Sequence, residues 1–198
     1  MEHNVVGNLY DKYGTRNPIA RRLVQGFLDA VTGLYAQARP TSVLEVGCGE
    51  GHLARRLRAV HVPDRFVASD VDLGSIAPDL DPAIEVVEAS IYRLPWPDRS
   101  FDLVVCCEVL EHLSHPALGL AEVVRVAKRH VLVSTPWEPM WRILNVARGR
   151  YLRDLGNTPG HVQHFTRAGL HRLVAPHLRV VASRHPLPWT VLLGEPVR

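Results

Sequence analysis

Short apolar segments alternate with helical patterns along most of this 198-residue chain. Five segments are long enough for a strand, and they lie at residues 42–46, 65–69, 84–88, 101–107 and 130–134. The segment at 101–107 is apolar along most of its length, as expected of a strand that is buried on both faces. Strands that alternate with helices predict a parallel sheet with helices on both of its faces.

The end of the chain departs from this alternation. Residues 178–183 and 190–193 are two further predicted strands, and only the segment 184–189 separates them. A connection this short cannot make a parallel crossover, so the two strands must form an antiparallel hairpin. The sequence therefore predicts an α/β fold, with a Rossmann-like, doubly wound, seven-stranded sheet that is mostly parallel and has its last strand reversed.

Helices are expected between the strands, in one domain that spans residues 1–198. The first begins where Asn17 can cap it and Pro18 suits its first position, and it runs to about residue 36. We expect residues 1–36, including the polar segment at its start, to form a cover over the site. Further helices are predicted at about residues 51–60, 116–127 and 166–175, and residues 137–165 form a long insertion before the last of these.

The first strand runs directly into a glycine-rich turn, EVGCGEG, at residues 45–51. Alternate glycines let the backbone turn sharply and let a ligand approach closely at the carboxyl edge of the sheet. A nicotinamide dinucleotide needs a third glycine three residues after the second, and His52 stands there instead. Glu45 and Glu50 would repel a pyrophosphate but suit a cationic ligand.

An aspartate ends the second strand and supplies a second part of the predicted site. Asp70 lies 23 residues after Gly47, where a carboxylate can accept hydrogen bonds from both hydroxyls of a ribose. Asp72 lies two residues further on and could exchange roles with it. The strand end favours Asp70 as the ribose ligand.

Four segments resemble, in this order, the signature segments of class I S-adenosylmethionine-dependent methyltransferases: VLEVGCGEGHLARRL, FVASDVD, RLPWPDRSFDLVVCCEVLEHLSHP and HVLVSTP. The LEHL segment resembles the small-molecule group that includes quinone-ring O-methyltransferases. The resemblance covers roughly residues 41–183. It implies S-adenosyl-L-methionine as the cofactor and is nearly silent on the methyl acceptor.

The resemblance also implies roles for single residues. The loop Gly47–Gly51 would face the methionine part of the cofactor, together with Glu45. Ser90 stands where the family usually has an acidic residue for the adenine amino group, so it can accept a hydrogen bond but brings no charge. The implied cofactor-binding residues are Glu45, Gly47, Cys48, Gly49, Gly51, Asp70, Val71, Ser90, Ile91 and Cys106.

The residues after the fourth strand limit the class of acceptor. They lack the Asp/Asn-Pro-Pro-aromatic turn of enzymes that methylate base amines, and Cys106 and Cys107 lack the proline that accompanies a cytosine-C5 nucleophile. We interpret both cysteines as small core residues. The net charge of +3 comes from dispersed basic residues, which does not favour nucleic acid as the partner. A small molecule, methylated on a hydroxyl oxygen, is the expected acceptor.

Three histidines are candidates for the catalytic base, because imidazole titrates near neutral pH. His164 ranks first, because the resemblance implies a histidine just before the Phe-Thr that opens the last helix. His161 lies in the same loop, and His112 shares a face with Glu108 if a helix has begun there. We expect the insertion 137–165 to act as a lid, and its arginines favour an anionic or lipid-linked substrate.

Three expectations remain for the chain as a whole. No apolar run is long enough to span a membrane, and the first residues lack a secretory signal pattern, so we predict a cytoplasmic protein. The three cysteines agree with a reducing compartment, and their spacing predicts no metal. A non-catalytic module that binds S-adenosylmethionine is the first alternative, and a nicotinamide-dependent oxidoreductase is the second.

Overall fold

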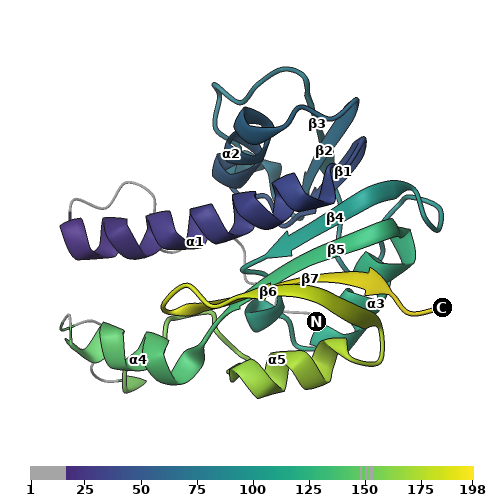
Figure 1. The fold of residues 1–198 in the computed structure, drawn as a ribbon. Coiled ribbons are helices and arrows are strands. Elements are labelled where there is room, and N and C mark those ends of the chain that lie inside the picture. Colours follow the sequence, from purple (N-terminus) through teal and green to yellow (C-terminus); the bar gives the residue numbers. More distant parts are fainter. Residues whose placement is uncertain (1–16, 148, 150, 152–153) are drawn as a thin grey trace.

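A computed structural model describes residues 17–147, 149, 151 and 154–198. Seven strands form one sheet in the order β3-β2-β1-β4-β5-β7-β6. The neighbours from β3 to β5 pair in parallel, whereas β7 is antiparallel to both β5 and β6 (Figure 1). This confirms the predicted α/β fold and its reversed last strand. The strands are β1 (Ser42–Val46), β2 (Arg65–Asp70), β3 (Ile84–Glu88), β4 (Phe101–Cys107), β5 (Ala127–Pro136), β6 (Leu178–Arg184) and β7 (Trp189–Pro196).

Four strands are longer than predicted, β2 and β6 by one residue and β5 and β7 by several. β5 begins at Ala127, which the sequence placed at the end of the preceding helix, because Ala127 pairs with Phe101 across the sheet. β7 extends past the predicted residue 193 to Pro196, where it pairs with Leu178. In both cases sheet pairing extends a strand into residues whose sequence shows no strand pattern.

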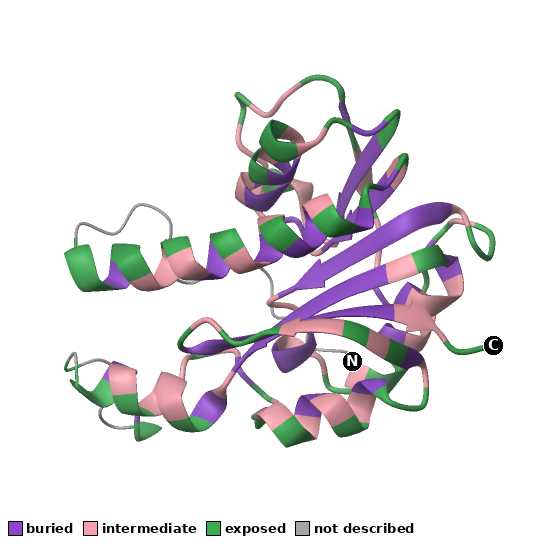
Figure 2. Ribbon diagram, in the orientation of Figure 1, coloured by how far each residue is buried: buried purple, intermediate pink, exposed green. Residues whose placement is uncertain are grey.

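Helices cover both faces of the sheet (Figure 1). Asn17 caps α1 as predicted, since its side chain accepts hydrogen bonds from the backbone N–H groups of Ile19 and Ala20. The helices α1 and α2 share one apolar core with the sheet, and α3 and α5 share the other. Figure 2 shows that the central strands between these two cores are buried. The helices are α1 (Pro18–Ala38), α2 (His52–Val60), α3 (Pro116–Val126), α4 (Glu138–Ala147) and α5 (Arg167–Val174), with short 3-10 turns η1 (Leu73–Ser75) and η2 (Leu110–His112).

The carboxyl ends of the parallel strands define the edge where a ligand can bind. In Figure 1 the first half of α1 and the whole of α4 extend beyond the ends of β4 and β5 on that side. Of the predicted cover, residues 1–16 lie outside the described residues. None of the described helices is both long and apolar enough to span a membrane.

Candidate functional site

The glycine-rich turn after β1 has the conformation that its sequence predicts. Gly47 and Gly51 have φ angles of 74° and 82°, in the left-handed region that favours glycine. The backbone N–H groups of Gly47 and Cys48 both donate to the carbonyl oxygen of Ser69, so the turn is fixed to the end of β2. A Cβ atom at Gly47 would lie 2.5 Å from a methyl carbon of Val109.

Substituting Gly47 by alanine is therefore expected to destabilise the protein. The left-handed φ costs a non-glycine residue roughly 1–3 kcal/mol, and the contact with Val109 adds to this cost. The melting temperature should fall by at least about 3 °C in a chain of this size. Gly33→Ala is the control, because a Cβ atom at that helical glycine would meet no neighbouring atom within 4 Å; an equal loss in both variants would contradict the explanation.

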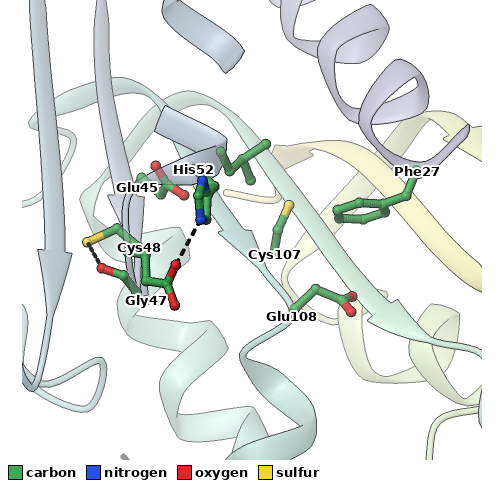
Figure 3. Close-up of a pocket in the computed structure, with 10 residues that line it drawn as sticks. Phe27, Glu45, Gly47, Cys48, His52, Cys107 and Glu108 are labelled. Carbon is green, nitrogen blue, oxygen red and sulfur yellow. Dashed lines mark hydrogen bonds and ion pairs between the residues drawn. The ribbon is translucent and has the colours of Figure 1, made fainter. Parts of the chain in front are cut away.

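A pocket opens beside this turn, with an empty volume of about 430 Å³ that includes space open to solvent. Figure 3 shows that α1, β1 and the end of β4 contribute to it, and that the Phe27 ring points toward Cys107. Phe27, Cys107 and Glu108 were not among the cofactor residues predicted from the sequence, because only the fold brings Phe27 of α1 to the end of β4. The lining residues are Phe27, Glu45, Gly47, Cys48, Gly49, Glu50, His52, Leu53, Cys107 and Glu108.

Glu45 is the buried acid of this pocket. Its side chain is only 3% exposed, and its Oε2 atom has no hydrogen-bond partner among the described residues. Burial raises the pKa of Glu45 to about 8, and the negative charge of Asp70 contributes to the increase. A positively charged group in the pocket would favour the ionised carboxylate and would partner the open oxygen.

Asp70 lies next to the pocket and is tied to the glycine turn. Its Oδ2 atom accepts the backbone N–H of Gly49 at 2.8 Å, and Oδ1 accepts those of Val71 and Asp72 at 2.7 and 3.3 Å. A carboxylate oxygen has two lone pairs, so these bonds leave capacity for further donors. Asp72 itself caps η1 by accepting the backbone N–H of Gly74.

The other predicted cofactor residues are less close to the pocket. Ser90 is half-buried, and its hydroxyl accepts the backbone N–H of Tyr92. The side chain of Ile91 is buried next to Gly119 of α3, so only its backbone could meet an adenine ring. Cys106 is fully buried in the α3–α5 core, and its neighbour Cys107 lines the pocket instead.

Both cysteines are core residues, as the sequence indicates. Burial raises the pKa of the Cys106 and Cys107 thiols well above the usual range. Thiols that do not ionise near neutral pH are poor nucleophiles. The alternation of side chains along β4 explains why the pocket contains Cys107, because successive residues point to opposite faces of the sheet.

Most of the residues that line this pocket lie in a part of the chain that is similar to known proteins. Residues 44–134 match a family model described as a methyltransferase domain. Those residues include the glycine turn and Asp70. This part of the chain is therefore similar to S-adenosylmethionine-dependent methyltransferases.

Individual relatives agree with this similarity. The "Probable S-adenosylmethionine-dependent methyltransferase MT3114" of Mycobacterium tuberculosis is 39% identical over 98 residues, which are 48% of this chain and 35% of that protein. The chain thus spans about a third of the length of that relative. "Ubiquinone/menaquinone biosynthesis C-methyltransferase UbiE" of Burkholderia mallei is 29% identical over 168 residues, 78% of this chain and 68% of that protein. Magnesium protoporphyrin IX methyltransferase from Synechocystis, solved with bound SAH, has the same fold, with a TM-score of 0.66 at 14% identity over 93% of this chain and 90% of that one.

The three candidate histidines have different surroundings. His161 is buried, and its Nδ1 atom lies 2.7 Å from Oε1 of Glu138 in α4. The His161 ring packs against His112, with 5.0 Å between the ring centroids. His164, which the sequence analysis ranked first, is exposed, and its Nε2 atom lies 3.0 Å from the side-chain oxygen of Asn157.

His112 is held by the insertion and not by a helical relation to Glu108. Glu108 has a φ of 61°, so no helix continues through it, and the expected shared face does not form. The Nδ1 atom of His112 instead lies 2.9 Å from the carbonyl oxygen of Gly160. The backbone N–H groups of Val162 and Gln163 both donate to the carbonyl oxygen of Glu111, so the second half of the insertion is fixed to η2.

A chain of aromatic rings joins the histidine pair to the pocket beside the glycine turn. Phe27 packs against Trp189 with centroids 5.0 Å apart, and Trp189 packs against Trp141 at 5.4 Å. Trp141 then stacks on His161 at 6.1 Å. The Trp189 ring also donates its N–H to Oε2 of Glu108 at 2.6 Å. The sequence gives no periodic signal for this arrangement, because its rings come from α1, from β7, and from two separate parts of the insertion.

Proposed function

We propose that the chain transfers a methyl group from S-adenosylmethionine to a hydroxyl oxygen of a small molecule. The buried side chain of Glu45 at the glycine turn is the main support for the proposed cofactor. Its pKa is raised, and its Oε2 atom has no hydrogen-bond partner among the described residues. In our proposal Glu45 faces the ammonium and sulfonium end of the cofactor, and Asp70 accepts hydrogen bonds from the ribose. The adenine then lies near Val71, Ser90 and the backbone of Ile91.

The acceptor half of the proposal rests on the histidine pair. η2 begins two residues after the pocket residue Glu108. It places the His112 ring against the His161 ring of the insertion. The sulfonium is already an activated electrophile, so holding the acceptor in line with the methyl group supplies much of the rate. Polar atoms that bind the acceptor hydroxyl and favour loss of its proton supply the rest.

We further propose an acceptor of the phenol or quinol type for this small-molecule enzyme. The LEHL segment and the similarity to a quinone-biosynthesis methyltransferase support this class. The insertion 137–165 would close over the acceptor, and its arginines would suit an anionic or lipid-linked molecule. We also propose a cytoplasmic location, which three free, buried cysteines support.

Substitution of the two loop histidines tests which one serves the acceptor. His161→Ala should lower turnover at least tenfold and leave S-adenosylhomocysteine affinity nearly unchanged, because the cofactor residues lie around β1 and β2. His164→Ala, with an exposed ring, should keep both properties. Release of S-adenosylhomocysteine, measured with a panel of phenols and quinols, provides the readout.

Loss of turnover only in His164→Ala would show instead that His164 serves the acceptor, as the sequence predicts. Product analysis by mass spectrometry and NMR distinguishes methylation of oxygen from methylation of carbon. Binding of S-adenosylmethionine with no turnover on any acceptor would instead support the non-catalytic module.

A further inference from the structure

We propose that Glu111, His112 and His161 bind a divalent transition-metal ion of the zinc type. One ligand atom from each of these residues lies within 4.8 Å of the other two. We call these three residues the two-histidine cluster. The metal-binding step stands on its own, whereas the use of the ion in methyl transfer rests on the proposed function.

The cluster is inside the protein and its backbone is fixed. Glu111 is 1% exposed and His161 is 8% exposed. The backbone bonds from Val162 and Gln163 to Glu111 hold the two contributing segments together. Ligand atoms bonded to one zinc ion at about 2.0–2.2 Å lie up to roughly 4 Å apart, so a small side-chain adjustment completes the coordination.

Each imidazole is oriented by a hydrogen bond at its Nδ1 atom. A carbonyl oxygen and a carboxylate can only accept, so Nδ1 of His112 donates to Gly160 and Nδ1 of His161 donates to Glu138. In neutral rings the lone pair is then on Nε2, which is the atom a metal ion would take. A metal-bound histidine whose other nitrogen donates to a carboxylate or carbonyl is the usual arrangement at such sites.

The surroundings of Glu138 are a second, independent observation in favour of an ion. Its carboxylate is 2% exposed, and its Oε2 atom has no hydrogen-bond partner among the described residues. Two acidic side chains, Glu111 and Glu138, therefore lie in a buried site around two imidazoles. Buried charge is costly unless it is compensated, and a divalent cation between these groups would compensate it.

The ligand set indicates the class of ion and its use. Two histidines and one carboxylate bind zinc or ferrous iron and leave coordination positions open for water or substrate. In the proposed reaction Glu111, His112 and His161 would hold the ion, and an acceptor hydroxyl that reached an open position would have its pKa lowered, so that its proton could pass to water. The oxygen lone pair would then form the new O–CH₃ bond while the S–CH₃ bond broke and its electron pair returned to sulfur.

Cobalt(II) binding to the full, tag-free chain after chelator treatment tests the site directly. We expect one equivalent of Co²⁺ to give visible d–d absorption bands, and one equivalent of Zn²⁺ to remove them. His161→Ala should abolish the bands, and Glu138→Gln should weaken Co²⁺ binding about 10- to 100-fold. His164→Ala is the matched control and should bind Co²⁺ like the unmodified chain, because its histidine lies outside the cluster.

Circular dichroism establishes that each variant is folded, and Glu138→Gln decides the matter if His161→Ala does not fold. A folded, unmodified chain without saturable Co²⁺ binding would overturn the proposal. Equal loss in His164→Ala and His161→Ala would also overturn it, because the ion would then lie elsewhere. Metal that binds at the cluster without any methyl transfer would refute the proposed function and leave the metal site intact.

Discussion

Replacement of Asp70 by alanine should weaken S-adenosylhomocysteine binding by roughly 100-fold. Two hydrogen bonds from ribose hydroxyls to a charged acceptor are lost, at about 1.5 kcal/mol or more each. The bonds that Asp70 accepts from Gly49 and Val71 are lost as well, which loosens the glycine turn. Isothermal titration calorimetry measures the affinity, and the ligand-induced increase in melting temperature should nearly disappear.

Asp72→Ala is the control for this experiment. Asp72 lies two residues from Asp70, and its carboxylate caps η1. It should lower the stability slightly and change the ligand affinity only a few-fold. If Asp72→Ala removed the binding and Asp70→Ala kept it, the ribose ligand would be Asp72.

The affinity for S-adenosylhomocysteine should increase with pH between about pH 6 and 8 because of Glu45. Its pKa in the free protein is about 8, so most molecules carry a protonated Glu45 at neutral pH. The positively charged amino group of the ligand favours the ionised carboxylate and so lowers this pKa. Binding below pH 8 must therefore release a proton, and the affinity increases by up to about tenfold per pH unit.

Glu45→Gln should abolish this pH dependence and reduce the affinity at pH 8. Glu50→Gln should retain the dependence, because Glu50 is partly exposed and pairs with His52. The same pKa affects the free protein. Its folded-state value lies above the unfolded-state value, so the contribution of Glu45 to stability is present at low pH and is lost as the pH rises toward 8. A ligand affinity independent of pH in the unmodified chain would show that Glu45 does not face the amino group.

The fold could be predicted from the sequence because it depends on local patterns. β1, β3 and β4 have the predicted bounds, since each is a short run with turn signals at its ends. The reversed β7 followed from the length of the connection before it. The extra residues of β5 could not be predicted, because Lys128 and Arg129 are exposed and lie at an irregularity between the pairs Phe101–Ala127 and Leu103–His130.

The site was only partly predictable, for a similar reason. The glycine turn and Asp70 are neighbours because β1 and β2 are adjacent parallel strands, and this follows from their order. The contact between Glu138 and His161 joins residues 23 positions apart in an insertion with no regular period. The preference for His164 came from a resemblance to related sequences with a histidine before the Phe-Thr of the last helix, and this does not reveal which ring points inward. Burial decides that, and the arrangement of α4 against the loop sets the burial.

The hydrogen bond from Trp189 to Glu108 has a consequence for biosynthesis. Glu108 lines the pocket, and its indole partner follows 81 residues later in β7. At about 5–20 residues per second, a ribosome needs roughly 4–16 s to add that length. Until then β5 has an unpaired edge where β7 will lie, and such an edge can pair with other chains. A nascent chain should therefore form the contact that holds Glu108 only after the ribosome has added β7.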